Sequence, residues 1–209
     1  MIAVPKTPRG RATRERIVTA ASDLIQERGV AETSIEDVLA RAGASKSQLY
    51  HYFDDREALL RAVVWHNADD VLARQSPHLG SLDSWKAIRA WFDSLVQLQV
   101  ERRGCGGCPV GSLVGQLVEA DEWARLALED SFARWELQVR DGLRLMQARG
   151  KLDRTADPDE LATATMAAIQ GGLLLTQARR DPHQLAIALD AAYAHLRAHA
   201  PRREGRITM

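Results

Sequence analysis

The sequence has little of what defines several protein classes. It contains only two cysteines in 209 residues, and no apolar run approaches the roughly 18 residues needed to span a membrane. We therefore expect no disulfide scaffold, no membrane partner and a reducing, cytoplasmic compartment. The first residues hold no apolar segment of the kind found in secretory signals. Apolar residues make up 45% and charged residues 27%, which excludes a chain that is disordered throughout.

Strand signals and the usual catalytic motifs are also missing. No segment alternates apolar and polar residues over the length of a strand. No second Cys-x-x-Cys completes a zinc site, and no nucleophile is paired with a base. We expect no metal and no cofactor, and an all-α enzyme is a remote alternative.

Net charge is also absent, because 28 basic residues balance 28 acidic ones. The sign nevertheless changes along the chain. Residues 1–16 hold five basic side chains against one acidic, and residues 115–135 hold five acidic against two basic. The balance argues against a polybasic coat for nucleic acid but leaves local DNA contacts open.

Apolar residues recur with a helical period over most of the chain. The pattern predicts nine helices, at residues 13–28, 34–42, 45–51, 55–74, 82–102, 109–119, 121–149, 158–179 and 182–199. Ser76, Pro77 and Gly80 are expected to end the fourth helix. We predict an all-α fold with a three-helix domain over residues 1–55 and a helical bundle over residues 56–199. Residues 1–10 and 200–209 are expected to be disordered.

Capping boxes mark three of these helix starts, because each pairs a short oxygen side chain with an acceptor three residues later. The boxes are Thr33-x-x-Glu36 or Ser34-x-x-Asp37, then Ser45-x-x-Gln48, then Asp54-x-x-Glu57. Only Gly43 and Ala44 separate the second helix from the third. So short a turn, with a glycine able to adopt positive φ, predicts a helix-turn-helix.

The third helix presents polar groups over most of its surface, and Leu49 is its one plainly buried residue. Short hydroxyl and amide side chains at a helix start suit base edges and phosphates in a major groove. A solvated connecting helix in an ordinary bundle would show the same pattern. The candidate contacts are Ser45, Lys46, Ser47, Gln48, Tyr50 and His51.

Residues 33–60 resemble the DNA-binding domain of the TetR family of transcriptional regulators. They carry a Thr/Ser-opened helix, Ala-Gly-x-Ser, Leu-Tyr-x-x-Phe, and then a basic residue followed after two positions by Leu-Leu. The resemblance covers residues 13–64. It implies a homodimer that binds a double-stranded DNA operator and responds to a small-molecule effector, without enzymatic activity.

The resemblance also assigns individual contacts. It implies that the start of the third helix faces bases and that Tyr50 contacts a phosphate. Tyr52 stands where histidine is usual and Arg56 where lysine is usual, and both retain a group that can bind a phosphate. Arg11 and Arg14 are within reach of the DNA backbone or minor groove. The expected DNA contacts are Thr33, Ser34, Ser45, Lys46, Ser47, Gln48, Tyr50, His51, Tyr52 and Arg56.

Aromatic residues concentrate in the middle of the predicted bundle, where aromatic and methionine side chains line adaptable apolar pockets. Gln99 and Gln170 add polar groups to otherwise apolar faces. An ordinary core would account for any single one of these residues. The candidate effector pocket is lined by Trp85, Phe92, Cys108, Leu113, Leu117, Trp135, Met166 and Gln170.

The last two predicted helices, residues 158–199, are rich in alanine and leucine and are apolar on more than one stripe. A second buried face suggests a subunit interface. In the TetR family these helices pair with their mates as a four-helix bundle, so we expect a homodimer through this region.

The loop Gly-Cys-Gly-Gly-Cys at residues 104–108 is a separate candidate site. We expect Cys108 at the N-cap of the helix at 109–119, where the helix dipole would favour its thiolate. Gly-Cys-Pro-Val-Gly resembles a subset of TetR-like regulators, some of which sense electrophiles or oxidants through this cysteine. A small buried cysteine beneath a loop is the alternative.

These observations together predict a ligand-responsive transcriptional regulator, a repressor that an apolar or aromatic effector releases from a palindromic operator. Effector binding would swing the fourth helix and change the separation of the two DNA-binding units. The alternative is a thiol-based sensor that acts through Cys108 and Cys105.

Overall fold

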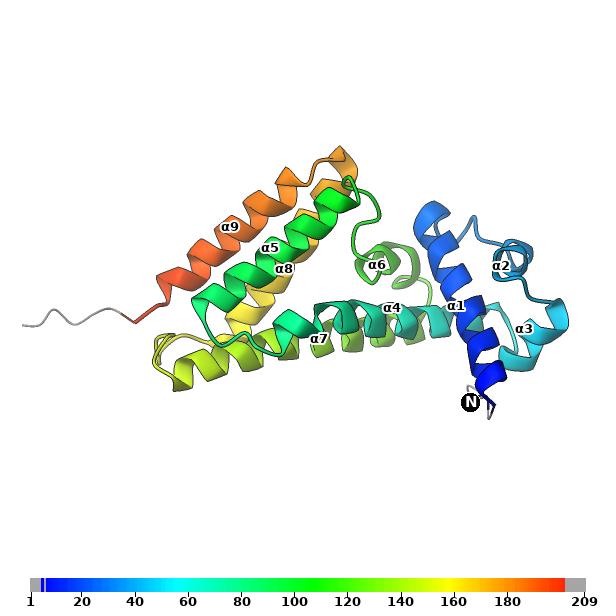
Figure 1. The fold of residues 1–209 in the computed structure, drawn as a ribbon, viewed down its shortest axis with the longest axis horizontal. Coiled ribbons are helices and arrows are strands. Elements are labelled where there is room, and N and C mark those ends of the chain that lie inside the picture. Colours follow the sequence, from blue (N-terminus) through cyan, green and yellow to red (C-terminus); the bar gives the residue numbers. More distant parts are fainter. Residues whose placement is uncertain (1–4, 6, 202–209) are drawn as a thin grey trace, which may run out of the picture. The chain divides into compact units, whose positions relative to one another are not determined.

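The computed structural model describes residue 5 and residues 7–201, and this part of the chain is all helical, without strands (Figure 1). The predicted all-α class is confirmed, and none of the described helices is long and apolar enough to cross a membrane. The helices are α1 Pro8–Arg28, α2 Ile35–Ala42, α3 Lys46–Tyr52, α4 Arg56–Leu79, α5 Trp85–Glu101, α6 Gly111–Leu117, α7 Glu122–Ala148, α8 Pro158–Arg179 and α9 His183–Ala198.

The helices form two compact units. The first unit contains the described residues up to Ala73 together with Pro109–Ser131, and the second contains Arg74–Cys108 and the residues from Phe132 onward. The first unit therefore extends beyond the predicted domain limit at residue 55, because most of α4, all of α6 and the start of α7 belong with α1–α3. Helices α4 and α7 each run through both units.

Reciprocal caps begin the two short helices of the first unit. Ser34 accepts a hydrogen bond from the Asp37 backbone N–H at 3.1 Å, and the Asp37 carboxylate accepts from the Ser34 N–H in return. Ser45 and Gln48 form the same box at the start of α3. Gly43 adopts the left-handed conformation between the two helices, with φ of 59°. These contacts produce the predicted helix-turn-helix.

Helix α1 begins earlier than its apolar periodicity indicates. Thr7 caps it by accepting from the Gly10 N–H at 3.1 Å, and Pro8 occupies the first turn, where a missing N–H costs nothing. Residues 8–10 are therefore helical, which corrects that part of the disordered arm predicted for residues 1–10. Residues 1–4, residue 6 and residues 202–209 lie outside the described part of the chain.

Helix α4 differs from its prediction at both ends. Its cap is Asp55, which accepts from the Ala58 N–H at 2.7 Å, so the predicted box at Asp54 is wrong. The helix also continues through Ser76 and Pro77 to Leu79. Pro77 lies in the last turn, and the helix ends two residues after it.

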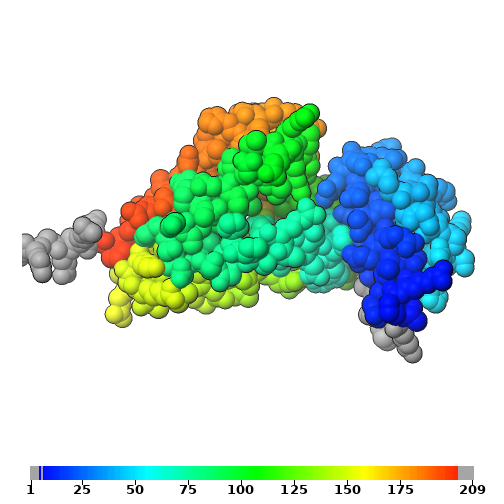
Figure 2. Space-filling view, in the orientation of Figure 1, coloured from blue at the N-terminus to red at the C-terminus, as the bar shows by residue number. Residues whose placement is uncertain are grey.

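The second unit is built on the antiparallel pair α8 and α9, with α5 beside α9 (Figure 1). Gly172 allows the close crossing, because a Cβ there would lie 2.7 Å from the Leu185 side chain. The buried Thr176 hydroxyl accepts from the Leu185 N–H at 3.1 Å, which joins the end of α8 to the start of α9. Figure 2 shows the surfaces of α5, in green, and α9, in orange to red, on the near face of this unit.

Candidate DNA-binding surface and effector site

Helix α3 is anchored by one buried side chain and exposes most of its other residues. Leu49 is fully buried against the first unit, as predicted, and Tyr52 is half-buried. The exposed residues of this helix and its cap are Ser45, Lys46, Ser47, Gln48, Tyr50 and His51. The capping box uses the carbonyl oxygen of the Gln48 amide, so the N–H₂ group takes no part in the cap. The surface offers hydroxyl, amide and ammonium groups to a DNA groove.

Two of the predicted contacts are engaged within the protein. Thr33 is buried and its hydroxyl donates to the Gly29 carbonyl at 2.8 Å, so Ser34 is the residue of this pair that reaches the surface. The Arg56 guanidinium donates to the carbonyls of Val30 and Thr33. Both side chains hold the turn between α1 and α2.

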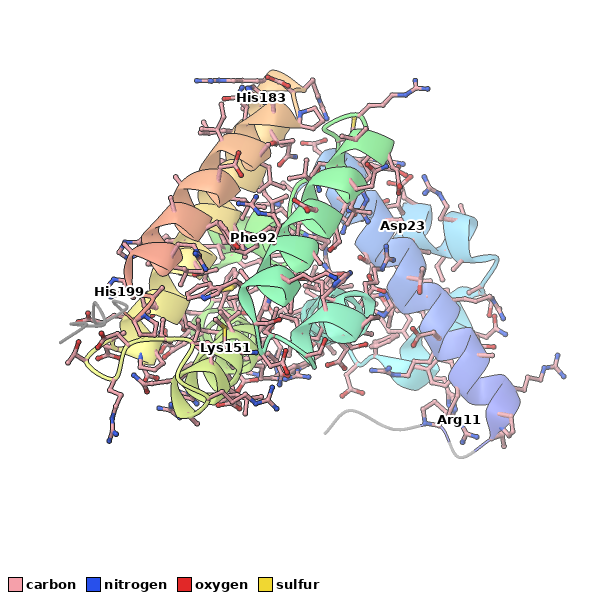
Figure 3. The ribbon with its side chains drawn as sticks, turned by 60° about the vertical axis from the view of Figure 1, so that its left-hand side comes forward. Arg11, Asp23, Phe92, Lys151, His183 and His199 are labelled. Atoms are coloured by element: carbon pink, nitrogen blue, oxygen red, sulfur yellow. The ribbon has the colours of Figure 1, made fainter. Side chains whose placement is uncertain are left out.

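Of the two arginines of α1 that were expected to reach DNA, one packs within the protein and the other is exposed. Arg14 is half-buried, with its guanidinium carbon 5.2 Å from the centre of the Phe53 ring. Arg11 is exposed near the start of the helix (Figure 3) and donates to the Pro5 carbonyl at 3.4 Å. Arg11 is therefore the more accessible of the two predicted arm residues.

Ion pairs and capping hydrogen bonds lower the pKa values of two carboxylates around the helix-turn-helix. The Ser34 hydroxyl and backbone N–H, with a contribution from Arg28, lower the pKa of Asp37. The bidentate contact of Arg41, at 2.9 and 3.0 Å, lowers the pKa of Glu27. Both carboxylates therefore stay ionised at neutral pH and tie α2 to α1 or to its own first turn.

The core of the second unit contains a narrow gap that is too tight for a water molecule. The lining residues are Leu82, Ile88, Trp91, Val139, Leu143, Thr165 and Leu196. None of them is in the predicted pocket. Trp91 donates through its indole N–H to Gln75 at 2.9 Å, so its polar atom is satisfied.

Among the uncharged side chains that the structure describes in this unit, three buried polar atoms have no hydrogen-bond partner. They are Oε1 of Gln99, Nε1 of Trp135 and Nε2 of Gln170. Gln99 is only 2% exposed and Trp135 only 3%. Most buried polar atoms in proteins are hydrogen-bonded, so these three need an explanation.

The unpaired atoms of Gln99, Trp135 and Gln170 are all displaced from the narrow gap in the same direction, towards the end of the unit where α5 and α8 finish. The Gly104 backbone lies against that of Arg180, so the ends of α5 and α8 meet, and Gly142 of α7 packs on Leu82 before α5 begins. Gln99 comes after the gap residue Trp91 on α5, and Gln170 comes after Thr165 on α8. On α7, which contributes Val139 and Leu143 to the gap, Trp135 comes before both. At a rise of about 1.5 Å per residue, all three lie about 6–12 Å from the gap along the helix axes.

The predicted pocket residues fall into three groups. Phe92, Trp135 and Met166 are buried in the second unit and Gln170 is half-buried there. Phe92 lies on the side of α5 that faces α8 and α9 (Figure 3). Leu113 and Leu117 are buried on α6 in the first unit. Trp85 packs on the outer face, against the rings of Tyr193 and the guanidinium of Arg197. Residues 88, 91, 95 and 99 recur at a helical spacing and share the buried face of α5. This spacing would have favoured Trp91 over Trp85 as a residue in the core of the second unit.

The two cysteines do not form a disulfide. Helix α6 begins at Gly111 with Val110 as its cap, so Cys108 precedes the cap by two residues and the predicted N-cap position is wrong. Pro109 and Val110 form a turn instead. Cys108 is buried, and Cys105 is exposed with its thiol donating to the Arg103 carbonyl.

The exposed faces of α8 and α9 are apolar. Leu174 is 67% exposed and Ile187 is 53% exposed, whereas their neighbours Leu173 and Leu189 are buried in the single chain. The exposed residues of these faces also include Ala164, Ala167, Gly171, Leu175, Ala178, Ala191 and Ala194. An apolar surface of this kind marks an interaction site.

Comparisons with known proteins agree with this arrangement. Residues 17–63 match the profile of "Bacterial regulatory proteins, tetR family", and residues 84–191 match "Transcriptional regulator LmrA/YxaF-like, C-terminal domain". An uncharacterized HTH-type transcriptional regulator in the lacX 3′ region of Lactococcus lactis is 33% identical over 179 residues, which is 82% of this chain and 86% of the relative. The HTH-type transcriptional repressor DhaR of Mycobacterium sp. (strain GP1) is 24% identical over 82% of this chain and 86% of its own.

The fold has solved counterparts as well. A TetR transcriptional regulator from Chloroflexus aurantiacus superposes with a TM-score of 0.82 at 24% identity, covering 93% of this chain and 98% of its own. These relatives are transcriptional regulators, so the enzyme alternative is wrong. The chain belongs to the TetR family of DNA-binding transcriptional regulators, with a C-terminal domain of the LmrA/YxaF-like type.

Proposed function

We propose that the protein is a repressor that binds a palindromic operator as a homodimer and leaves it when an apolar or aromatic effector binds in the second unit. The exposed polar surface of α3 supports direct recognition of the operator. The relative DhaR carries the name of a repressor, which supports this sign of regulation. Because the operator would lie on the chromosome, the protein would act in the cytoplasm.

The single observation that carries the effector is the set of unpaired buried atoms on Gln99, Trp135 and Gln170. A buried polar atom without a partner costs about 1–3 kcal/mol, so its retention needs a compensating role. A ligand between α5, α7 and α8 would supply the partners, and Phe92 and Met166 would contact its apolar part. The narrow gap nearby would have to widen on binding.

The apolar faces of α8 and α9 support a homodimer through roughly residues 158–199. The small residues along the exposed stripe of α8 allow two helices to approach closely, and Leu174 and Ile187 supply contact area. An isologous dimer would present its two α3 helices to successive major grooves, about 34–36 Å apart.

Effector binding in the second unit would change operator affinity through the helices that run from one unit to the other. Helix α4 begins beside the helix-turn-helix and ends in the second unit. An effector would shift the equilibrium only by its differential affinity for the two arrangements of this helix.

A thiol sensor is the second candidate, because the Cys105 side chain is exposed. It has less support than an effector, since Cys108 is buried and lies outside the α6 cap that would favour its thiolate. The Gly-Cys-Pro-Val-Gly motif at residues 107–111 is the remaining argument for this alternative.

Gel retardation tests the proposal, with DNA from upstream of the protein's own coding region and a palindrome selected by the protein from a randomised pool. We expect one dimer per palindrome and loss of the complex when an apolar aromatic compound from a screened panel is added. Failure to select any DNA sequence would refute the regulator function. Release by mild oxidant that Cys105→Ser or Cys108→Ser abolishes would favour the thiol sensor.

A further inference from the structure

The turn between α1 and α2 is held from two sides by side chains outside it. The Val30 N–H donates to Oε1 of Gln116 on α6 at 2.7 Å. The Val30 carbonyl accepts from the guanidinium of Arg56 at the start of α4, which also donates to the Thr33 carbonyl at 3.3 Å. Both backbone groups of one residue are therefore fixed by side chains from two other helices of the first unit.

Gln116 is itself oriented for this contact. Its amide Nε2 donates to the Ser112 carbonyl one turn earlier on α6, at 2.8 Å, so both ends of the amide are engaged. Gly29 makes room for it, because φ is +89° there and a Cβ would lie 3.0 Å from Oε1 of Gln116. An L residue at position 29 would meet backbone strain as well as this close approach.

The start of α6 is tied to the same unit by a buried polar chain. The Pro109 carbonyl accepts from Nδ2 of Asn67 on α4 at 3.4 Å, and Oδ1 of Asn67 accepts from the Ser22 hydroxyl on α1 at 2.6 Å. Ser22 and Asn67 are both buried. Helix α6 is therefore anchored at its entry by Asn67 and reaches the α1–α2 turn through Gln116.

We propose that Gln116 is a positioning residue for operator recognition. Val30 precedes Ser34, the cap of α2, by four residues, so the place of the Val30 peptide sets where α2 and then α3 begin. Gln116 makes this contact from outside residues 17–63, the segment that matches the DNA-binding profile. The inference rests on the proposed function, because the chain enters α6 directly from the second unit at Cys108–Pro109. A movement there that displaces α6 would withdraw the Gln116 acceptor from the turn.

Two substitutions at one position separate this role from simple packing. Gln116→Leu keeps the bulk but removes the acceptor, whereas Gln116→Glu keeps an acceptor for the Val30 N–H. We expect Gln116→Leu to weaken binding to the selected palindrome by about two- to tenfold, the range for one lost hydrogen bond, and Gln116→Glu to bind within about twofold of wild type. The salt dependence should not change, since no phosphate contact is lost.

Hydrogen exchange at the Val30 amide gives a second readout. Exchange should accelerate in Gln116→Leu and stay near the wild-type rate in Gln116→Glu. Gln97→Leu, at an exposed position of α5, is the matched control and should change neither quantity. Wild-type affinity in Gln116→Leu, or an equal loss in both variants, would overturn the proposal. Failure of the wild-type protein to select any DNA would instead refute the proposed function.

Discussion

The Arg56 guanidinium donates through Nη2 to the carbonyls of Val30 and Thr33, although the residue as a whole is exposed. We expect Arg56→Ala to weaken operator binding by about 1 kcal/mol through loss of these hydrogen bonds, with the salt slope unchanged. Arg56→Lys should lose less, because both hydrogen bonds come from the single nitrogen Nη2 and an ammonium group also carries several donors on one nitrogen. Titrations of the selected palindrome at several salt concentrations measure both quantities. A slope that falls by about one in Arg56→Ala, but not in Arg56→Lys, would show a phosphate contact instead.

Gln99 places an unpaired Oε1 in the core of the second unit. Methionine has nearly the same shape without the polar atom, so Gln99→Met should raise the free energy of unfolding by about 1 kcal/mol in the absence of effector. The same variant should bind the operator normally. It should be released less readily by an active compound, because the oxygen that we propose binds the effector is also the unpaired atom that lowers stability without it.

Urea unfolding of Gln99→Met and of the control Gln97→Met measures the effect. Gln97 lies two residues earlier on the exposed side of α5 and should be neutral. Destabilisation of Gln99→Met by more than the control would mean that Oε1 is hydrogen-bonded in solution and that the effector site lacks this support.

At the level of elements, adjacent residues of α8 lie on two different faces of the helix, one packed in the core and one exposed. Leu173 is 7% exposed and Leu174 is 67% exposed. Leu174→Glu should therefore leave a folded chain that no longer forms a dimer, whereas Leu173→Glu should unfold it, because a buried charge without a partner costs several kcal/mol, roughly.

Sedimentation and circular dichroism distinguish these outcomes. Operator binding should fall with dimerisation in Leu174→Glu, since a single α3 reads only one half-site. A Leu174→Glu variant that stays dimeric at micromolar concentration would exclude this face of α8 from the interface.

Helix α3 shows how a short element is stabilised without a large core contribution. It has seven residues, a reciprocal cap at Ser45 and one buried anchor, Leu49. Most of its remaining side chains are therefore exposed. The cap and the Gly43 turn hold it in place, because an isolated helix of this length would not form in water.

At the level of the whole molecule, surface carboxylates with lowered pKa values occur in both units. Hydrogen bonds from arginine lower the pKa of Glu27 and Glu122 in the first unit, and of Asp83 and Asp159 in the second. The folded state binds fewer protons than the unfolded state near the ordinary carboxyl pKa, so stability is present above about pH 4.5 and falls as the pH drops further.

The midpoint of urea unfolding should therefore be nearly constant from pH 6 to 7 and decrease between about pH 5 and 3. High salt should flatten the decrease, because these pairs are exposed and screened. A midpoint that does not change over this range would show that the ion pairs contribute nothing to stability.

The two units are linked covalently at three places, within α4, at Cys108–Pro109 and within α7. Each link offers a ligand in the second unit a route to the helix-turn-helix. Gln116 follows the second link on α6 and contacts the α1–α2 turn. Asn67 of α4 contacts both Pro109 at that link and Ser22 on α1. The molecule thus has a short route from the second unit to the residues that set the position of α3.

Local chemistry in the sequence was sufficient to predict the all-α class, the helix-turn-helix and most helix limits. Capping pairs such as Ser45 with Gln48 and turn glycines such as Gly43 act within a few residues, so their effect can be inferred from spacing alone. The exposure of α3 followed from the same argument, since Leu49 was its only apolar anchor.

The tertiary structure decided which face of each helix meets which neighbour. It placed Trp85 on the outer face and Trp91 beside the gap, and it engaged Arg56 with the Val30 and Thr33 carbonyls. It also brought Gln116 to Val30, 86 residues away in the chain. Such contacts depend on the packing of several helices at once, and helical periodicity identifies an apolar stripe without identifying its partner.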